Sequence, residues 1–325
     1  MLSTLPPELH QAAERYLTCE LVTIDAAGRP IAWPVTPYFR AEEGCIDVTT
    51  GVGYPKKADD AARNPRVAML FSDPTGSGVA DAPMVLVQGI ARVDDSDLEA
   101  NRRRYEEEMA RKLPALHALA PTGAMKRFFS WYYDRIYLHV RPERVYVWPR
   151  GELEAEPTLY DAHVEEVRSG HNEEPEEGHV PPEGGMDVWD PRLDRLGTDD
   201  PTAVLAFVGP DGFPFAVRVP VRADQAAHVV RIEADPVGAP IEAGPACLCA
   251  HAHAEDLTWQ RSYQVRGDLA EEGGGFVLHP HRVVAGLQLP QSAFERYRVN
   301  VRKILRFRKT ARERTRAHTG AESPG

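Results

Sequence analysis

Two adjacent lysines, Lys56 and Lys57, stand in the stretch of this 325-residue chain whose residue types best suit ligand binding. The stretch is YPKKADDAARNPRVAMLFSDP, residues 54–74, and it predicts a short helix followed by an apolar strand. The N-terminus of a helix presents free backbone N–H groups and the positive end of its dipole, and both favour an anion. Ammonium groups at this position suit an anionic group such as a phosphate, and solvated surface charge is the alternative for two paired lysines.

A second group of reactive side chains lies in CLCAHAHAED, where Cys247, Cys249, His251 and His253 alternate. Alternating residues face one side of a strand, and thiolate with imidazole is a zinc-binding combination. Successive residues on one face are about 6.5–7 Å apart, so four of them cannot surround one tetrahedral ion, and at most two could share a metal. We therefore predict packing in a core and assign no metal site. A metal or haem contact and redox thiol chemistry are the alternatives.

The elements that must position these residues occur twice in the chain. Residues 21–36, LVTIDAAGRPIAWPVT, align without a gap on residues 205–220, LAFVGPDGFPFAVRVP, with five identities. Each copy predicts an apolar strand, a turn that contains glycine, and a second strand with alternating polarity. Both copies are therefore interpreted as β-hairpins.

Three further pairs of segments follow in the same order. NPRVAMLFSD (64–73) corresponds to GPACLCAHAH (244–253), VLVQGIARV (85–93) to YQVRGDLA (263–270), and HVRPERVYVW (139–148) to VLHPHRVVAG (277–286). The second half is four residues shorter where the first half carries its two lysines, so the lysines have no counterpart. We predict a mainly β protein of the α+β class, with two tandem barrels of about six short, mostly antiparallel strands each.

The first domain is predicted to span residues 1–150, with a helical insertion near 95–135. It is followed by a strongly acidic segment, because residues 151–187 contain twelve acidic side chains and one arginine. A segment this polar cannot bury a core, so residues 151–200 are predicted to form an acidic, Pro/Gly-rich linker.

The second domain is predicted to span residues 201–325 and to end in an amphipathic helix. Ten Lys or Arg and two Glu lie between residues 295 and 316. The apolar stripe of this helix is expected to consist of Phe294, Tyr297, Val301, Ile304 and Leu305. We expect the basic side chains to dock on acidic parts of the same chain.

The composition is that of a globular protein, with 42% hydrophobic and 27% charged residues. A net charge of −11 argues against nucleic acid as a partner of the whole chain. No stretch approaches the roughly 18 apolar residues of a membrane span. The N-terminal segment MLSTLPPELHQAAERYL lacks the pattern of a secretory signal, and four cysteines do not make a disulfide framework. We expect a soluble cytoplasmic protein.

The first half resembles the pyridoxamine 5′-phosphate oxidase-like flavoproteins, whose fold is the FMN-binding split β-barrel. The resemblance covers about residues 15–150. It rests on GRPIAWPV, DVTT at 47–50, PKKADDAA at 55–62 and NPRVAML at 64–70, followed by the closing strand RPERVYVW. The second half resembles the same fold only through the repeat.

This resemblance implies a flavin-dependent oxidoreductase that uses FMN. Lys57, with Lys56 beside it, would hold the FMN phosphate, and Thr49 and Thr50 would donate hydroxyl groups to the same oxygens. The edge of the isoalloxazine ring would be contacted by Trp33, Pro34, Val35 and Thr36. No catalytic residue is assigned, because the flavin would carry the hydride or the electrons.

In this family two barrels pair as a dimer with the flavin at their interface. The resemblance therefore implies that the two halves form an intramolecular pseudo-dimer; a homodimer of the whole chain stays open. The segment TWQRSYQVRG would supply the facing wall, with Arg261 and Trp259 as candidate contacts. The chain departs from the family pattern at Asp59 and Asp60, which would repel a phosphate held nearby.

Other functions remain open from the residues alone. Related split barrels bind a deazaflavin coenzyme in the same groove, although its longer anionic tail would need more cations. A non-catalytic, haem-handling barrel would depend on His251, His253, His279 and His281 instead of Lys57. A nucleic-acid-binding module would act through the basic C-terminal helix, with strong salt dependence. The substrate, expected to be a small molecule, and the electron donor are not specified by the sequence.

Overall fold

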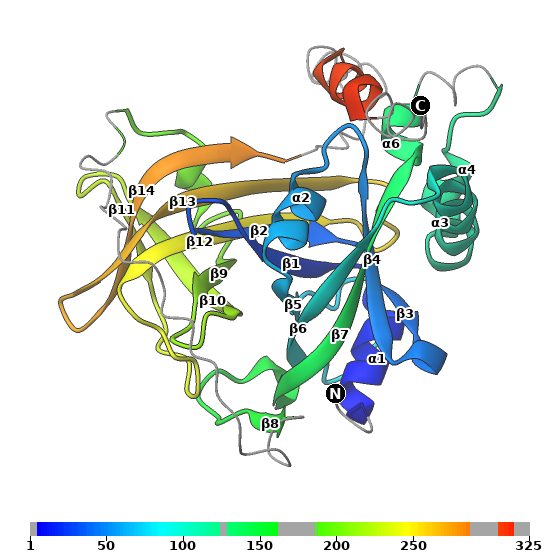
Figure 1. Cartoon of the computed structure of the whole chain (residues 1–325). Helices are drawn as coiled ribbons and strands as arrows, with labels where there is room; N and C mark the ends of the chain where they lie inside the picture. Colours follow the sequence, from blue (N-terminus) through cyan, green and yellow to red (C-terminus); the bar gives the residue numbers. More distant parts are fainter. Residues whose placement is uncertain (1–4, 124–128, 162–185, 187, 287–304, 315–325) are drawn as a thin grey trace.

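The computed structural model describes residues 5–123, 129–161, 186, 188–286 and 305–314. The first half of the chain forms an eight-stranded sheet, and the second half forms a closed barrel (Figure 1). Paired strands are antiparallel in both. This architecture confirms the predicted fold class, a mainly β protein with two tandem split barrels, of which the first is a curled half-barrel.

The first sheet follows the order β2-β1-β5-β6-β7-β4-β3, and β8 also pairs with β7. Its strands are β1 (Cys19–Ile24), β2 (Pro30–Val35), β3 (Tyr38–Arg40), β4 (Cys45–Gly51), β5 (Arg66–Phe71), β6 (Met84–Asp94), β7 (Arg135–Trp148) and β8 (Thr158–Asp161). Two helices, α1 (Pro7–Arg15) and α2 (Lys56–Arg63), bury apolar side chains in the core of this sheet. The predicted insertion between β6 and β7 contains α3 (Leu98–Lys112), α4 (Pro114–Ala118) and α6 (Ser130–Tyr133).

The second barrel closes in the order β10-β11-β14-β13-β12-β9. Its strands are β9 (Thr202–Val208), β10 (Pro214–Asp224), β11 (Val229–Ile232), β12 (Gly244–His253), β13 (Gln260–Glu272) and β14 (Gly275–Ala285). Around this ring, β10-β9-β12-β13-β14-β11 adjoin one another in the same order as β2-β1-β5-β6-β7-β4 of the first sheet. The segments that match in sequence thus occupy matching places in the two sheets.

Glycines at matching positions of the two halves allow the hairpin turns and the β-bulges. Gly28 and Gly212 have φ values of +73° and +76° and sit in the turns of the β1–β2 and β9–β10 hairpins, where residues with a Cβ are strained. Gly89 and Gly267 each stand at a β-bulge, opposite a proline of the next strand. A Cβ at either position would lie 2.3 or 2.1 Å from a backbone carbonyl oxygen, so only glycine fits the close approach.

The two halves share a continuous apolar core. Successive residues of a strand face opposite sides of a sheet, so β1 buries Leu21 in the core of the first sheet and Val22 against the second barrel. The shared core includes Leu70 and Leu86 from the first sheet and Leu248 from the second barrel. The halves are therefore packed together and are not joined by the linker alone.

The ends of the predicted linker are structured. Residues 158–161 form β8, and Leu193 and Leu196 are buried in the core of the second barrel. Most of the acidic stretch between them lies outside the described residues. These contacts attach the two ends of the segment to different halves of the molecule.

Residues 305–314 form a helix that packs on the first half, beside α6 (Figure 1). Of the predicted apolar stripe, Phe294, Tyr297, Val301 and Ile304 lie outside the described residues. The expectation for Leu305 was wrong: it is 60% exposed, whereas Phe307 and Ala311 face the protein. The reason is that Phe307 packs on aromatic residues of the first half, which sets the rotation of the helix. None of the described helices is long and apolar enough to span a bilayer.

Candidate functional site

Lys57 lies in the first turn of α2 and is partly buried. Its ammonium group is 5.6 Å from the centre of the Tyr54 ring. Burial and the nearby charge of Arg135 lower the pKa of Lys57 to about 8. In the described part of the chain, no carboxylate lies within ion-pair distance of this ammonium group. Lys57 is therefore a partly desolvated cation without a counter-ion among the described residues.

Arg135, the first residue of β7, is a second cation in the same region and is buried. Its guanidinium donates hydrogen bonds to the hydroxyl groups of Tyr54 (2.7 Å) and Tyr105 (2.6 Å). It also stacks on the rings of Tyr105 and Tyr132, at 4.0 and 4.2 Å from their centres. Its neighbours among the described residues are thus phenols, which do not neutralise its charge. Lys57 and Arg135 together create a positive potential beside the N-terminus of α2.

The other predicted lysine is differently placed. Lys56 forms an ion pair with Asp60 (2.9 Å), and its side chain is 53% exposed. Asp60 also pairs with Arg63 (2.8 Å), and Asp59 pairs with Arg314 of the C-terminal helix (2.6 Å). Both acids that were expected to repel a phosphate are thus paired with cations, which weakens their repulsion of an anion at Lys57.

The predicted threonines are close to Lys57 in sequence but differ in their contacts. The hydroxyl of Thr50 donates a hydrogen bond to the carbonyl oxygen of Tyr54 (2.9 Å) and so shapes the loop that leads into α2. Thr49 is partly exposed on β4 and lies opposite Tyr137 of β7. Of the two threonines, Thr50 holds the loop before α2 through its hydroxyl, and Thr49 does not.

The segment Trp33–Thr36 is partly buried along and just beyond β2, which is an edge strand of the first sheet. The second barrel covers part of this edge, since Gln264 donates a hydrogen bond to the carbonyl oxygen of Ala32. Trp33 lies so close to Gly286 that a Cβ at Gly286 would be 3.0 Å from its ring. The edge of β2 therefore lies at the contact between the halves, where the sequence predicted the cofactor.

The facing residues predicted from the second half are engaged elsewhere. Arg261 forms an ion pair with Asp200 (2.6 Å) and lies 5.7 Å from the ring centre of Trp259. These interactions stay within the second half of the chain. The structure thus brings Thr50, Tyr54 and Lys57 together but gives Arg261 a structural partner of its own.

The C-terminal helix covers the loop before α2. Phe307 lies 5.4 Å from Tyr54 and 5.2 Å from Trp131, measured between ring centres. Arg314 additionally pairs with Asp95 (2.8 Å). The described part of this basic helix is therefore docked on the first half through apolar contacts and ion pairs.

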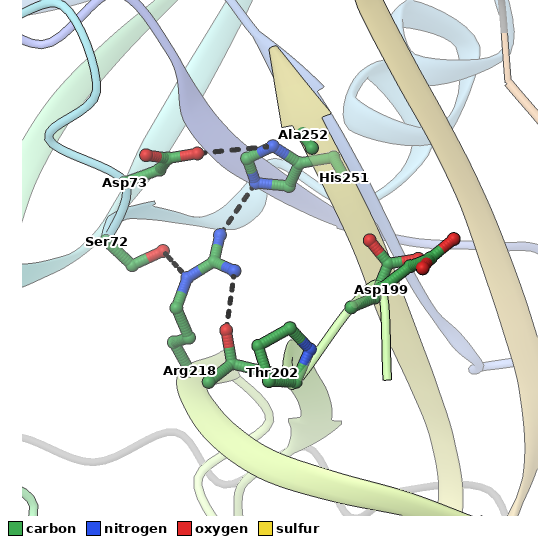
Figure 2. Close-up of a pocket in the computed structure, with 9 residues that line it drawn as sticks. Ser72, Asp73, Asp199, Thr202, Arg218, His251 and Ala252 are labelled. Atoms are coloured by element: carbon green, nitrogen blue, oxygen red, sulfur yellow. Dashed lines mark hydrogen bonds and ion pairs between the residues drawn. The ribbon is translucent and has the colours of Figure 1, made fainter. Parts of the chain in front are cut away.

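A second polar site lies where the two halves meet, and we call Glu20, Ser72, Arg218 and His251 the interface cluster. Figure 2 shows Ser72, Arg218 and His251 of this cluster. Glu20 is completely buried and accepts hydrogen bonds from His251 Nε2 (2.5 Å), Ser72 (2.8 Å) and Arg218 (3.3 Å). Burial by itself would raise the pKa of Glu20, but His251 and Arg218 hold it below its ordinary value. Glu20 is thus an anion that joins β1 to β10 and β12.

A cavity of about 230 Å³ adjoins the interface cluster. Its lining residues are Ser72, Asp73, Asp199, Asp200, Pro201, Thr202, Arg218, His251 and Ala252 (Figure 2). Both halves therefore contribute charged side chains to one cavity.

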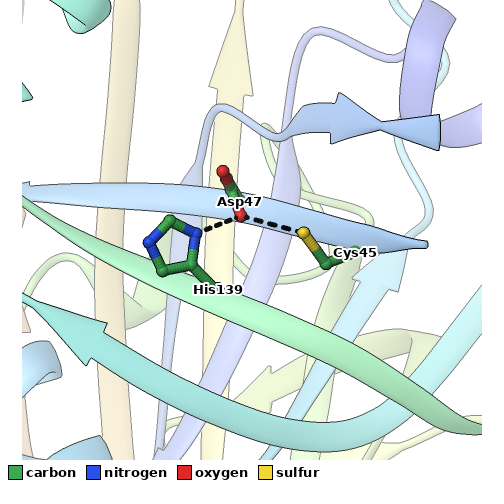
Figure 3. A group of neighbouring side chains, drawn as sticks. All are labelled: Cys45, Asp47 and His139. Carbon is green, nitrogen blue, oxygen red and sulfur yellow. Dashed lines mark hydrogen bonds and ion pairs between the residues drawn. The ribbon is translucent and has the colours of Figure 1, made fainter. Parts of the chain in front are cut away.

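A third cluster, Cys45, Asp47 and His139, lies between β4 and β7 (Figure 3). Asp47 is fully buried, accepts a hydrogen bond from His139 Nδ1 (2.7 Å) and forms an ion pair with Arg104 of α3. Burial and the charge of Asp47 raise the pKa of Cys45 to about 11, so the thiol stays protonated at neutral pH. Because Asp47 is already neutralised and Cys45 is a thiol, this cluster is a structural network that attaches α3 to the sheet.

Sequence reasoning missed Arg135 and Glu20 as site residues. Arg135 meets Tyr54 across 81 positions of the chain, and Glu20 meets His251 across 231. The only local signal for Glu20 is a charged residue inside an apolar strand, where a buried carboxylate needs a partner. Cys247 and Cys249 are buried in the shared core, as expected from the strand pattern.

Comparison with known proteins gives only distant likenesses. No protein-family model and no curated protein matches the chain. General stress protein 26 from Bacillus anthracis str. Sterne is 16% identical, with a TM-score of 0.31 over 47% of this chain and 95% of its own. A related protein of the pyridoxinephosphate oxidase family from Clostridium acetobutylicum is 10% identical, with a TM-score of 0.33 over 47% and 92%. An F420 reductase is 20% identical, with a TM-score of 0.32 over 43% and 98%. At such TM-scores the likeness carries no conclusion about family or activity.

Proposed function

We propose that the protein binds a flavin mononucleotide through Lys57 and acts as a flavin-dependent oxidoreductase on a small molecule. One observation carries this proposal: Lys57 is a partly buried ammonium group beside Arg135, with no acidic partner in the described part of the chain. The sequence motif PKKADDAARNPRVAML, which resembles that of FMN-binding split barrels, supports the same assignment.

The electrostatics favour a doubly charged ligand group. In the free protein, burial and Arg135 make the charged form of Lys57 unfavourable, which is why its pKa is lowered. A phosphate dianion would neutralise this charge in a partly desolvated place, where the attraction is stronger than in water. The backbone N–H groups in the first turn of α2 would add to the attraction.

The rest of the proposal assigns separate roles to the edge strand β2, to the flavin and to the protein. Trp33–Thr36 would contact the ring, because an edge strand such as β2 offers unpaired backbone polar groups. When bound, the flavin supplies the hydride or electron chemistry, whereas the protein binds it, orients the substrate and excludes water. Arg261 and Trp259 have no role in this proposal, because Arg261 is paired with Asp200.

The first test identifies the chromophore. The purified full-length chain is denatured, and any released compound is identified by chromatography and mass spectrometry; apoprotein is titrated with FMN and followed by flavin fluorescence. FMN release or binding supports the proposal, and release of a deazaflavin or haem replaces it with one of the alternatives. A colourless preparation that does not bind FMN would refute it.

The second test compares the two lysines, which are adjacent in sequence and carry the same charge. Lys57→Ala should weaken FMN binding at least tenfold, which corresponds to about 1.4 kcal/mol. Lys56→Ala is the matched control and should have little effect, because Lys56 is exposed and paired with Asp60. Equal effects of the two substitutions would show that the phosphate is not held at Lys57.

A further inference from the structure

Three metal-ligating side chains from the two halves converge at the edge of the cavity: Asp73, His251 and His253. Asp73 follows β5, and the histidines lie at the end of β12. One oxygen, Oδ2 of Asp73, is 3.8 Å from Nδ1 of His251 and 3.4 Å from Nε2 of His253. The ligand atoms all lie within 4.8 Å of one another.

These separations suit an ion between the groups better than direct contact. A direct hydrogen bond would place the heavy atoms about 2.7–3.2 Å apart. Ligands about 2.0–2.1 Å from a tetrahedral Zn²⁺ are separated from one another by about 3.4 Å. The two distances from Asp73 are close to this second value, so the three side chains are spaced as ligands of one ion.

The opposite nitrogen of each histidine is already held by an acceptor. His251 Nε2 lies 2.5 Å from Oε1 of Glu20, and His253 Nδ1 lies 2.9 Å from the carbonyl oxygen of Ala254. With an N–H at each of these positions, the lone pair is on Nδ1 of His251 and on Nε2 of His253, the two nitrogens whose distances to Asp73 are given above. A metal-bound histidine typically donates its other N–H to a carboxylate or a backbone carbonyl, and this fixes its tautomer. Both histidines follow this pattern.

Arg218 also approaches His251 Nε2 and, as a donor, competes for this nitrogen with the N–H that Glu20 accepts. Nη2 of Arg218 is 2.7 Å from His251 Nε2 and 3.3 Å from Oε1 of Glu20, so both cation and imidazole meet at one carboxylate oxygen. The ionised carboxylate accepts from both groups, and His251 Nδ1 keeps its lone pair. The alternative, in which Nε2 accepts from Arg218, would leave Glu20 and an imidazole lone pair in repulsive contact.

The burial of the three side chains provides both a rigid site and an entry path. The histidine side chains are each only 2% exposed, whereas that of Asp73 is 17% exposed and lines the cavity of about 230 Å³. The hydroxyl of Thr18 is 3.1 Å from His253 Nε2, so an ion bound at this nitrogen would replace the hydrogen bond that Thr18 donates to it. The cavity side of the site is thus where a further ligand can enter.

We propose that Asp73, His251 and His253 bind one divalent transition-metal ion such as Zn²⁺, with an open coordination position toward the cavity between the halves. Two imidazoles and one carboxylate are the ligand set of zinc and iron(II) sites that keep a position for water or substrate. Glu20 orients His251 from behind. The site is separate from Lys57, and the proposal does not depend on flavin binding.

This proposal revises the sequence-based assignment of no metal site. The geometric limit derived for the strand still holds, because only two of its four alternating residues take part. The third ligand comes from the other half of the chain, at the position that corresponds to His253 in the aligned segments 64–73 and 244–253. A search confined to one strand could not find it.

Zinc binding by the full-length chain, prepared without a histidine tag and stripped with a chelator, tests the proposal. Isothermal titration with Zn²⁺ should show one ion per chain. Asp73→Asn and His253→Gln should each weaken binding by more than tenfold, and Glu20→Gln should weaken it by about 10–100-fold, as expected for a residue that orients a ligand. His279→Gln is the control, since His279 pairs with Glu272 at an exposed position.

Two further measurements test zinc binding even if one of the variants folds poorly. Circular dichroism and urea unfolding of each variant separate a folding defect from a lost ligand, and His253→Gln alone suffices if Asp73→Asn is unstable. Co²⁺ bound to the native chain should give visible ligand-field bands without a thiolate charge-transfer band. No binding of Zn²⁺, binding that survives both ligand substitutions, or a thiolate band would overturn the proposal. Lys57→Ala should leave zinc binding unchanged. Failure of the flavin proposal can therefore be distinguished from failure of the zinc proposal.

Discussion

Replacing Asp47 by asparagine should lower the free energy of unfolding more than a substitution that removes an exposed charged group. Asp47 is completely buried and accepts the hydrogen bond of His139 (Figure 3). It also forms an ion pair with Arg104. Asparagine has nearly the same shape, so the substitution removes the charge and leaves no cavity. Both partners lose this charge: His139 is buried, and the side chain of Arg104 is 27% exposed, so water compensates the guanidinium only in part.

The size of the effect follows from these contacts. Removing one partner of a buried ion pair costs about 3–5 kcal/mol because the other charge is left uncompensated. Arg104 keeps a second partner, Glu108, at 2.8 Å, so the expected loss is at the lower end, about 3 kcal/mol. With a urea slope of about 3 kcal/mol per molar, the midpoint should fall by about 1 M.

The assay is urea unfolding followed by tryptophan fluorescence, with Glu233→Gln as the control. Glu233 pairs with Arg222 at 2.6 Å, but both side chains are exposed, so its loss should cost less than about 1 kcal/mol. A midpoint for Asp47→Asn that equals that of the control would refute the reasoning.

The pH dependence provides an independent check on Asp47. Burial opposes its ionisation, but the hydrogen bonds and charges of His139 and Arg104 hold its pKa below the ordinary value. A carboxylate with a lowered folded-state pKa stabilises the protein above its unfolded pKa of about 3.9, and this contribution is lost as the pH falls further. The difference between the native chain and Asp47→Asn should therefore be complete at neutral pH and shrink below about pH 4. A difference that stays constant down to pH 3 would contradict this account.

Two further predictions concern the cofactor site and the bulges. Lys57 has a pKa of about 8 in the free protein, so FMN affinity should fall as the pH rises above 8, by up to tenfold per pH unit. Lys57→Ala should abolish this pH dependence. An FMN affinity that does not change with pH in the native chain would exclude Lys57 as the phosphate ligand. Gly89→Ala should destabilise the protein by about 1–3 kcal/mol in urea unfolding, because the new Cβ would lie 2.3 Å from the carbonyl oxygen of Arg141. Gly275→Ala, with nothing within 4 Å of the added Cβ, should be nearly neutral, and equal losses at both positions would argue against the steric explanation.

The strands and turns of this protein were largely predictable because their signals are local. The aligned hairpins, the alternating strand of Cys247 to His253 and the helix that begins at the lysines all appear as predicted. Each depends on residues within a few positions of one another, and the pleat or the helical turn alone fixes which side chains share a face. The matched glycines at the bulges follow the same logic, since no other residue fits there.

The charged contacts of the candidate sites were not predictable in this way. The pair of Lys56 with Asp60 is local, because the two residues are four positions apart on one helix. Nothing near Lys57 indicates that Arg135 would lie beside it, and nothing near His251 indicates that Glu20 would hold its ring. These long-range contacts depend on how the sheets curl and on which strand edges meet, and packing of the apolar faces decides both.

The amino-acid sequence by itself determined two sheets of similar plan, a lysine-bearing helix in the first, and a row of alternating cysteines and histidines in the second. Tertiary packing decided which of those groups meet: it placed Lys57 beside Arg135, and it brought Asp73 of one half to His251 and His253 of the other. The physical reason is that periodicity within a strand sets the direction of each side chain, whereas burial of the shared apolar core sets which strands lie against each other.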